Sequence, residues 1–336
     1  MALNFGSEFL GSLPPIETTL RFEEVVDNRA TLSKHRDTYS FIDPFRFKNT
    51  LRGKVVLITQ AHRGIGRSTA LAFALAGASV CCVGPTSESL ESLLCEIKER
   101  YNTPTLALTA NLLIPNAPAQ TVQLVEQYRG PVDILINITP ASYSRAFEQE
   151  TDIMKDWWPA MEAGVRVPVD LIHAVLPSMI QRGQGIIIST TMVSAVIQAP
   201  YMSAQGTASA ALLKFHHQLH SETAKKGIAS FPVHPGLVPS HMHDPGNQFQ
   251  AQPEYIGQEP GFRDRVKAVV TNMEWCSAGL ASGTFLALCA DPRAKVLSGL
   301  YINAERDLEE VIGKVEADWG EGVREERKYI LKVDEY

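Results

Sequence analysis

Three polar residues that lie close together in the sequence could do chemistry. His241 and His243 are two positions apart, and Asp244 follows directly. Imidazole and carboxylate side chains bind metal ions and transfer protons near neutral pH. The surrounding segment stays polar as far as about Gly261, which favours solvent-exposed loop residues over a metal or acid–base cluster.

A second group of histidines lies within a predicted helix. His216, His217 and His220 are closely spaced, and positions 216 and 220 share one face of the helix. We interpret them as helix-surface or subunit-interface residues rather than as metal ligands. The sequence therefore predicts no metal site.

The cysteines do not have the spacing of a metal site either. Neighbouring cysteines in a strand point to opposite faces of the sheet, as we expect for the pair in the strand-like run 78–83. We predict free, buried thiols in a reducing compartment, and hence a cytoplasmic protein. The five cysteines are Cys81, Cys82, Cys95, Cys276 and Cys289.

Length and composition exclude several classes of protein. The chain has 336 residues and 45% hydrophobic residues, enough for one large α/β domain. Its formal charge is −6 and it has no basic block, so nucleic acid is not an expected partner. No stretch approaches the roughly 20 apolar residues of a membrane span, and the N-terminus lacks the pattern of a signal peptide. A small molecule is the expected partner.

The elements that must position a site follow a regular pattern from Lys54 onward. Short apolar runs predict strands, and segments rich in Ala and Leu predict the helices between them. This alternation is typical of a single doubly wound α/β domain of the Rossmann type, with a parallel sheet and helices on both faces. Strands are predicted at 55–59, 78–83, 106–109, 132–136, 186–188 and 229–233, and the first helices at 68–78, 87–101 and 120–128.

Four segments in order resemble the short-chain dehydrogenase/reductase family. The turn Thr59–Gly66 resembles the T-G-x-x-x-G-x-G loop, and three family landmarks follow it at Asp133–Asn137, Ala204–Leu212 and Pro235–Ser240. The resemblance covers residues 51–305 and implies a substrate lid at 240–262. An N-terminal arm, 1–50, and a helical C-terminal tail, 306–336, lie outside it and are similar to extensions of fungal members.

The resemblance implies a dinucleotide site with several changes. Glycines in the turn let backbone N–H groups approach a pyrophosphate, and Arg63 could reach a phosphate, but Gln60 replaces the first glycine. The second strand ends without the acid or arginine that would bind the ribose. Binding of NADP or NAD is left open. The positions concerned are Gln60, Arg63, Gly64, Ile65, Gly66, Asn111, Asn137 and Ser240.

The same resemblance implies that all four catalytic positions have changed. Gln205 stands for the family's tyrosine and Ser209 for its lysine, while Met192, with Thr191 beside it, stands for the serine. Gly164 stands for the asparagine. None of these side chains titrates near neutral pH, so ordinary carbonyl reduction should be very slow.

A different alignment frame does not restore the catalytic residues. If Tyr201 were the acid, Gln205 would take the lysine position and the pair would still be missing. What remains is a concave, mostly apolar site at the C-terminal ends of the strands. Its expected lining includes Thr191, Met192, Tyr201 and Gln205, with Tyr143 and Trp157 or Trp158 as neighbours.

Three functions remain open. The first is a non-redox cyclase, isomerase or lyase that needs no cofactor and acts on a small, largely apolar metabolite in natural-product biosynthesis. The second is an NAD(P)-dependent oxidoreductase with a relocated acid, Tyr201 or His241. The third is a non-catalytic pseudoenzyme. A homodimer or homotetramer formed through helices around 155–181 and 206–226 is expected from the resemblance.

Overall fold

Strands and helices alternate along the chain as predicted. The computed structural model describes residues 32–139, 146–197, 202–239 and 275–317. Their strands are β1 (Val55–Ile58), β2 (Ser79–Gly84), β3 (Thr105–Thr109), β4 (Ile134–Asn137), β5 (Gly185–Thr190), β6 (Ile228–His234) and β7 (Ile302–Asn303). All of the predicted strands are present to within about two residues at each end.

Helices of several kinds connect the strands. The α-helices are α2 (Gly64–Leu75), α3 (Ser87–Arg100), α4 (Ala117–Arg129), α5 (Ile153–Asp156), α6 (Trp158–Met161), α7 (Val167–Arg182), α8 (Ser203–Thr223), α10 (Ala278–Ala290) and α11 (Leu308–Ala317). Short 3-10 helices are η2 (Ser40–Ile42), η3 (Pro44–Phe47), η4 (Phe147–Gln149), η6 (Val193–Ala195), η7 (Ala224–Lys226) and η9 (Pro292–Leu297), and η5 (Glu162–Arg166) is a π-helix.

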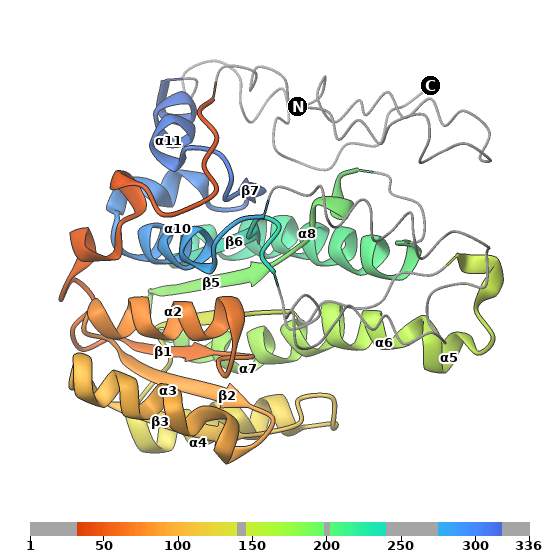
Figure 1. Ribbon diagram of the computed structural model, residues 1–336, viewed down its shortest axis with the longest axis horizontal. Helices are drawn as coiled ribbons and strands as arrows, with labels where there is room; N and C mark the ends of the chain where they lie inside the picture. The colour runs from red at the N-terminus through yellow and green to blue at the C-terminus, as the bar shows by residue number, and fades with distance from the viewer. Residues whose placement is uncertain (1–31, 140–145, 198–201, 240–274, 318–336) are drawn as a thin grey trace.

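The sheet has the doubly wound arrangement that the alternation predicts. Its order is β3-β2-β1-β4-β5-β6-β7, and every pair of neighbouring strands is parallel. The order reverses between β1 and β4, and open sheets of this kind bind ligands outside the carboxyl ends of the strands at such a point. Figure 1 shows α2, α3 and α10 on one face, with α7 and α8 on the other.

Alternate residues of each strand enter two separate cores, one on each face of the sheet. Val56 and Ile58 of β1 pack with α2, α3 and α10, whereas Leu57 packs with α4 and α7. Cys82 and Cys81 divide between the same two cores, which confirms their opposite orientation. All five cysteines are free thiols, but Cys95 is exposed, contrary to the prediction of buried thiols, because it lies on an outer face of α3.

The first helix begins earlier than predicted. It starts at Gly64 instead of residue 68, because its glycines allow the chain to enter the helix directly from the turn after β1. A Cβ at Gly66 would overlap the carbonyl oxygen of Gln60, so the first turn of α2 packs tightly against that residue. The helix N-terminus is thus brought to the end of β1.

The segment before β5 is a single long stretch of helix with an irregular centre. The π-helix η5 interrupts it and begins at Glu162. The stretch Ile153–Arg182 is long enough to cross a membrane, and an 18-residue window within it has a mean hydropathy of 1.3, which the sequence prediction did not anticipate. Its α7 part packs on the sheet through Leu171, Ile172, Val175 and Met179, as a core helix of a globular domain does.

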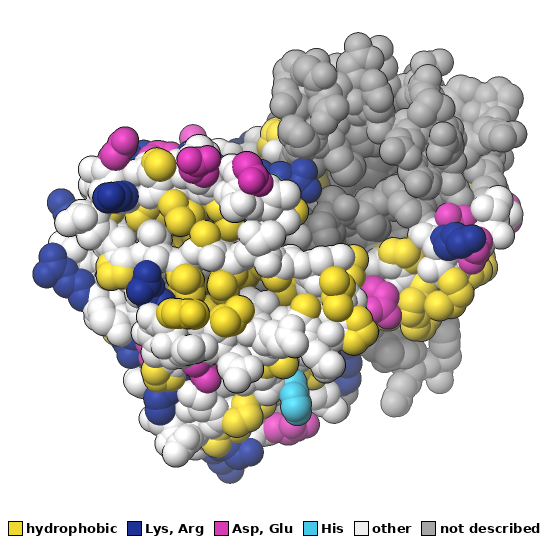
Figure 2. Space-filling view, turned by 90° about the horizontal axis from the view of Figure 1, so that it is seen from below, with side chains coloured by type: hydrophobic (Ala, Val, Ile, Leu, Met, Phe, Trp, Pro, Cys, Tyr) yellow, Lys and Arg dark blue, Asp and Glu magenta, His cyan; other side chains and the backbone are white. Residues whose placement is uncertain are grey.

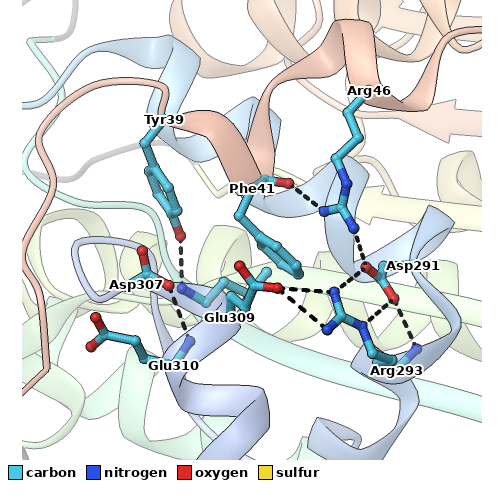
Figure 3. Close-up of polar contacts among 9 residues, drawn as sticks. Tyr39, Phe41, Arg46, Asp291, Arg293, Asp307, Glu309 and Glu310 are labelled. Carbon is cyan, nitrogen blue, oxygen red and sulfur yellow. Dashed lines mark hydrogen bonds and ion pairs between the residues drawn. The ribbon is translucent and has the colours of Figure 1, made fainter.

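The described part of the arm is integrated into the domain. Phe41 and Phe47 are buried in the same core as α10, although the sequence reading placed the arm outside the shared framework. Arg46 donates a hydrogen bond to Asp291 at 2.9 Å, and Arg293 binds the same carboxylate, as Figure 3 shows. Asp291 therefore lies between two guanidinium groups.

Helix α11 covers the arm in turn. The hydroxyl of Tyr39 accepts a hydrogen bond from the backbone N–H of Leu308 at 2.7 Å (Figure 3). His35 binds Asp307 at 2.9 Å and stacks on Tyr39. Both ends of the described chain thus pack together beside β7, a contact that no local sequence pattern predicts.

Candidate functional site

Threonines fix the backbone at the carboxyl ends of the central strands. Thr59, at the end of β1, accepts a hydrogen bond from the backbone N–H of Ile138 at 2.8 Å. Thr190, at the end of β5, accepts one from the N–H of Thr139, also at 2.8 Å. These two bonds hold the segment after β4 between its neighbouring strands, so the floor of the site is rigid.

The turn after β1 keeps the shape of an anion-binding turn. Gln60 has a positive φ of 52°, and Gly64 has one of 49°. The left-handed conformation at Gln60 costs roughly 1–2 kcal/mol for a residue with a Cβ, which confirms the expectation that this position favours glycine. Arg63 is exposed and precedes α2, whose N-terminus includes Ile65 and Gly66. This turn fits the pyrophosphate of a dinucleotide.

The end of β2 does not fit selective recognition of a ribose. Thr86 caps α3 by accepting a hydrogen bond from the N–H of Ser89, and the Ser89 hydroxyl donates back to the Thr86 carbonyl at 2.6 Å. The hydroxyl groups at this point are therefore used by the helix cap. Asn111, beyond β3, is exposed, and its Oδ1 accepts a hydrogen bond from the N–H of Leu113. Only its amide N–H groups are left for a base.

The first two turns of α8 carry two of the replaced catalytic positions and lie beside the segment that follows β5. Gln205 and Ser209 are both buried, 7% and 8% exposed. Gly206 lies so close to η6 that a Cβ on it would be 3.2 Å from the carbonyl oxygen of Ser194. Thr191 and Met192 lead into η6, so they lie next to the start of α8.

Gly164 and Trp157, from the long helical stretch 153–182, pack against the start of α8. A Cβ on Gly164 would lie 3.1 Å from the Cβ of Ala208 and 3.7 Å from the side chain of Thr139. The indole N–H of Trp157 donates to the hydroxyl of Ser203 at 3.1 Å. The structure therefore brings together the four positions that the resemblance singled out, with Trp157 beside them.

Buried polar side chains gather on the α8 face of the sheet at this edge. Strand alternation places Asn137, Ser189, Thr191 and His234 on the face opposite Ile136, Ile188 and Val233, which pack with α2 and α10. The Asn137 amide donates to Ser189 at 3.2 Å. All four are less than 5% exposed.

Several atoms of this group have no hydrogen-bond partner among the described residues. They are Oδ1 of Asn137, Oγ1 of Thr191 and Nδ1 of His234, and Oγ of Ser194 in η6 is unpaired as well. Buried polar groups are nearly always paired, so unpaired ones call for an explanation, of which a bound ligand or water is one. Unpaired buried atoms also occur elsewhere, among them Nε2 of His216, so it is their position at the carboxyl ends of the strands that favours a ligand here.

His234 is the titratable group of this corner. Burial lowers the pKa of its imidazole, whereas Glu305 and a hydrogen bond to the backbone of Thr191 favour its protonated form. Glu305 in turn accepts a weak hydrogen bond from the thiol of Cys276 at 3.5 Å. Burial, followed by the Glu305 charge, raises the pKa of that thiol to about 11, so it stays protonated.

The helix histidines serve the fold, which corrects the interpretation of His216 as a surface or interface residue. His216 is fully buried, and its Nδ1 binds the Ser230 hydroxyl at 2.6 Å. His220 binds Ser298 at 2.8 Å. The face shared by positions 216 and 220 turns inward against β6 and the segment before β7. Within the described ranges, no cluster of metal ligands is present.

Other predicted residues lie outside the described residues. They are Tyr143, Tyr201, Ser240, His241, His243 and Asp244, together with the expected lid, 240–262. Sequence reasoning missed His234. The signal was present, because a histidine at the end of a predicted strand, directly before the Pro235–Gly236 turn, lies at the edge where this fold binds ligands.

Exposed apolar side chains lie on the segment that leads into this corner. Figure 2 shows hydrophobic side chains gathered at the end of the molecule that carries α5 and α6. The exposed residues are Phe147, Ile153, Met154 and Trp158, at 59%, 42%, 67% and 41%. These exposed apolar side chains thus lie on a segment whose helix α6 packs against α8.

Comparison with known proteins agrees with this geometry. A family model described as short chain dehydrogenase matches residues 54–251. A short chain dehydrogenase of Pseudocercospora fijiensis, MYCFIDRAFT_6125, is 33% identical over 88% of this chain and 94% of its own length. Short chain dehydrogenase pigC of Monascus ruber is 29% identical over 89% of this chain and 93% of its own length.

Solved structures share the fold. An L-sorbose reductase from Gluconobacter frateurii, in complex with NADPH and L-sorbose, superposes with a TM-score of 0.64 at 23% identity. It covers 77% of this chain, and 97% of the reductase is matched. At this identity the likeness concerns the fold alone. Taken with the family model and the fungal relatives, it shows that the chain belongs to the short chain dehydrogenase family.

Proposed function

We propose that this protein is a non-redox enzyme, a cyclase, isomerase or lyase, that acts on a small, neutral and largely apolar metabolite. The observation that carries the proposal is the burial of Gln205 and Ser209 in the first two turns of α8. Both are uncharged side chains near the carboxyl ends of β4 and β5. A hydride transfer to a carbonyl requires a proton donor at the forming alkoxide, and neither side chain supplies one.

The substrate's class follows from the polarity of the corner and of its approach. Exposed Ile153, Met154 and Trp158 offer an apolar route, and Trp157 lies beside Ser203 at the inner end. The unpaired atoms of Asn137 and Thr191 can bind one or two hydroxyl or carbonyl groups. A charged substrate would find no opposite charge at these positions.

The residues act mainly by binding and orientation. The Gln205 amide can donate to a substrate carbonyl and hold it without transferring a proton. The rigid threonine contacts at the ends of β1 and β5 keep the segment after β4 in place while the substrate is bound. Restricting a flexible substrate in this way lowers the entropic cost of ring closure or rearrangement.

A dinucleotide is not needed for this chemistry. A bound NADP or NAD would supply or accept a hydride, and the turn formed by Gln60, Arg63 and Gly66 would hold its pyrophosphate. The hydroxyl groups after β2 are used by the cap of α3, so binding of the ribose should be weak. We propose that turnover is the same with and without the dinucleotide. The similarity to fungal short chain dehydrogenases supports, within this proposal, a reaction in natural-product metabolism.

Two measurements test the proposal together. Calorimetry with NADPH, NADP⁺ and NADH measures dinucleotide affinity, and mass spectrometry follows a panel of neutral aromatic ketones with and without NADPH. We expect products formed without NADPH, either isomers of unchanged mass or fragments that sum to the substrate. A gain of two hydrogens that strictly requires NADPH would contradict the proposal and favour an oxidoreductase with a relocated donor. A Gln205→Leu variant should lose conversion while keeping the NADPH affinity of the wild type.

A further inference from the structure

The turn that follows β6 is held by two neighbours from the C-terminal part of the domain. Gly236 has a φ of 84°, and a Cβ on it would lie 2.9 Å from Sγ of Cys276 and 3.5 Å from Cγ of Glu305. The backbone N–H of Cys276 donates to the carbonyl oxygen of Leu237 at 2.8 Å. This turn lies at the carboxyl end of β6, the edge of the sheet where this fold binds ligands. Its position therefore depends on where Cys276 and Glu305 are held.

Both neighbours are held in turn by residues of the arm. The backbone N–H of Ser277, next to Cys276, donates to the carbonyl oxygen of Arg36 at 2.7 Å. The carbonyl oxygen of Glu305 accepts a hydrogen bond from the backbone N–H of His35 at 2.8 Å. Because Cys276 and Ser277 are consecutive, one short segment bonds to the turn on one side and to the arm on the other. Two separate routes thus connect the arm to the turn.

The arm pairs with the segment after β7 in the manner of a strand. Lys34 and Arg306 form an antiparallel bridge. Beside it, the backbone N–H of Asp307 donates to the carbonyl oxygen of Ser33 at 2.9 Å. Together with the hydrogen bond from His35, these contacts make a short antiparallel ladder. We name residues 33–37 the strap, because they cross from this ladder to the N-terminus of α10.

Side chains fasten the strap to α11. The carboxylate of Glu310 accepts hydrogen bonds from the backbone N–H of Ser33 at 2.8 Å and from its hydroxyl at 2.7 Å. Nε2 of His35 lies 2.9 Å from Oδ2 of Asp307, and the imidazole stacks on Tyr39 with 3.8 Å between the ring centroids. Ser33 is exposed and His35 is partly buried, so these contacts can break without opening either core.

We propose that the strap is a conformational device that controls the order of the turn after β6, so that releasing Ser33 and His35 from α11 loosens the turn. The fastening is polar and lies at the surface, whereas Phe41 and Phe47 of the same arm are buried in the core and keep the arm attached. Local opening of the strap therefore leaves the rest of the domain folded. Coupling of this kind is reciprocal, so loosening the turn also loosens the strap.

Hydrogen exchange of single backbone amides, followed by NMR, tests the coupling. The double variant Ser33→Ala with His35→Ala removes the side-chain contacts with α11. We expect about 10-fold faster exchange at Ser277, which bonds to the arm, and at Cys276, which bonds to the turn. Exchange at Ile187, inside β5, should stay as in the wild type, because the domain remains folded. A faster Ser277 amide with an unchanged Cys276 amide would overturn the coupling.

Two further variants complete the test. Arg100→Ala is the control, because it removes an exposed ion pair with Glu96 of α3 and leaves the strap intact, so both reporter amides should exchange as in the wild type. Gly236→Ala places a Cβ against Cys276 and should, by reciprocity, accelerate exchange of the His35 amide in the ladder. An unchanged His35 amide in this variant would count against the proposal.

The remaining outcomes are equally decisive. Unchanged exchange at Ser277 in the double variant would show that these side chains do not fasten the strap, and would overturn the proposal. Equal acceleration at Ile187 and Cys276 would mean that the domain opens as a whole, which also contradicts a local device. None of these measurements uses a substrate or a dinucleotide, so failure of the strap is distinguished from failure of the proposed non-redox function.

Discussion

Two regions at the carboxyl ends of the strands, the turn after β1 and the start of α8, differ from the family pattern in different ways. At the turn after β1, Gly64 and Gly66 preserve the backbone path, and only Gln60 departs from the family pattern. At the start of α8 the helix is equally well formed, but Gln205 and Ser209 have replaced its reacting side chains. Binding by backbone groups survives substitution as long as the chain follows the same path. Catalysis by side chains does not.

The strongest test of the first region is Gly66→Ala. The added Cβ would overlap the Gln60 carbonyl, which is backbone and cannot move without breaking the turn. We expect a loss of more than about 4 kcal/mol in the free energy of unfolding, measured in urea. Gly313→Ala is the control, because nothing lies within 4 Å of its added Cβ and a helix interior favours alanine. A small effect at Gly66 would show that the turn is not held by this contact.

The matching test of the second region is Ser209→Lys, which returns the family's residue type to a buried position. An ammonium group buried here would lose its hydration, so we expect a loss of about 3 kcal/mol in unfolding free energy. Ser209→Ala should cost far less. If the lysine is tolerated at pH 7, the corner still suits a positive charge and the contrast between the two regions weakens.

The dependence of stability on pH tests whether the inner face of α8, which carries His216, is buried in solution. Burial lowers the pKa of His216 to about 3, whereas the unfolded chain binds that proton near 6.5. Below pH 6.5 the unfolded state therefore takes up a proton that the folded state does not. Stability should fall by about 2 kcal/mol from pH 7 to pH 5, as measured by urea unfolding. His216→Gln should make this dependence shallower, and an unchanged slope would mean that the histidine is not buried in solution.

The smallest expected effect is that of Gln60→Gly. The left-handed conformation at Gln60 favours glycine, but glycine also gains entropy in the unfolded chain, so the net stabilisation should be about 0.5 kcal/mol. NADPH affinity, measured by calorimetry, should rise because the Cβ no longer crowds the turn. Unchanged affinity would mean that weak dinucleotide binding is caused by the segment after β2 rather than by Gln60.

Local sequence patterns were enough to predict the sheet but not contacts between residues far apart in the sequence. Apolar runs such as 55–59 and 186–188 identify buried strands because each strand's environment is the same along its length. The change of the first glycine to Gln60 was evident because neighbouring glycines define the motif. Glu305 and His234 lie 71 positions apart, and only the pairing of β6 with β7 brings their segments together.

The contact between the arm and α11 could not be predicted from the sequence for the same reason. Tyr39 and Leu308 are 269 positions apart in the sequence, and neither residue type predicts a contact with the other. The early start of α2 was missed because glycines, which usually end helices, here permit a close approach to Gln60. Each of these features depends on tertiary packing rather than on local propensity.

The packing of the arm has a consequence for the order in which the protein can form. The backbone N–H of His35 donates to the Glu305 carbonyl at 2.8 Å, and the Arg36 carbonyl accepts from the N–H of Ser277 at 2.7 Å. The arm thus braces both segments that bring Glu305 to Cys276. The arm is synthesised before β1, whereas its partners Ser277 and Glu305 follow β6 and β7. These contacts can therefore form only after all seven strands of the sheet have been synthesised.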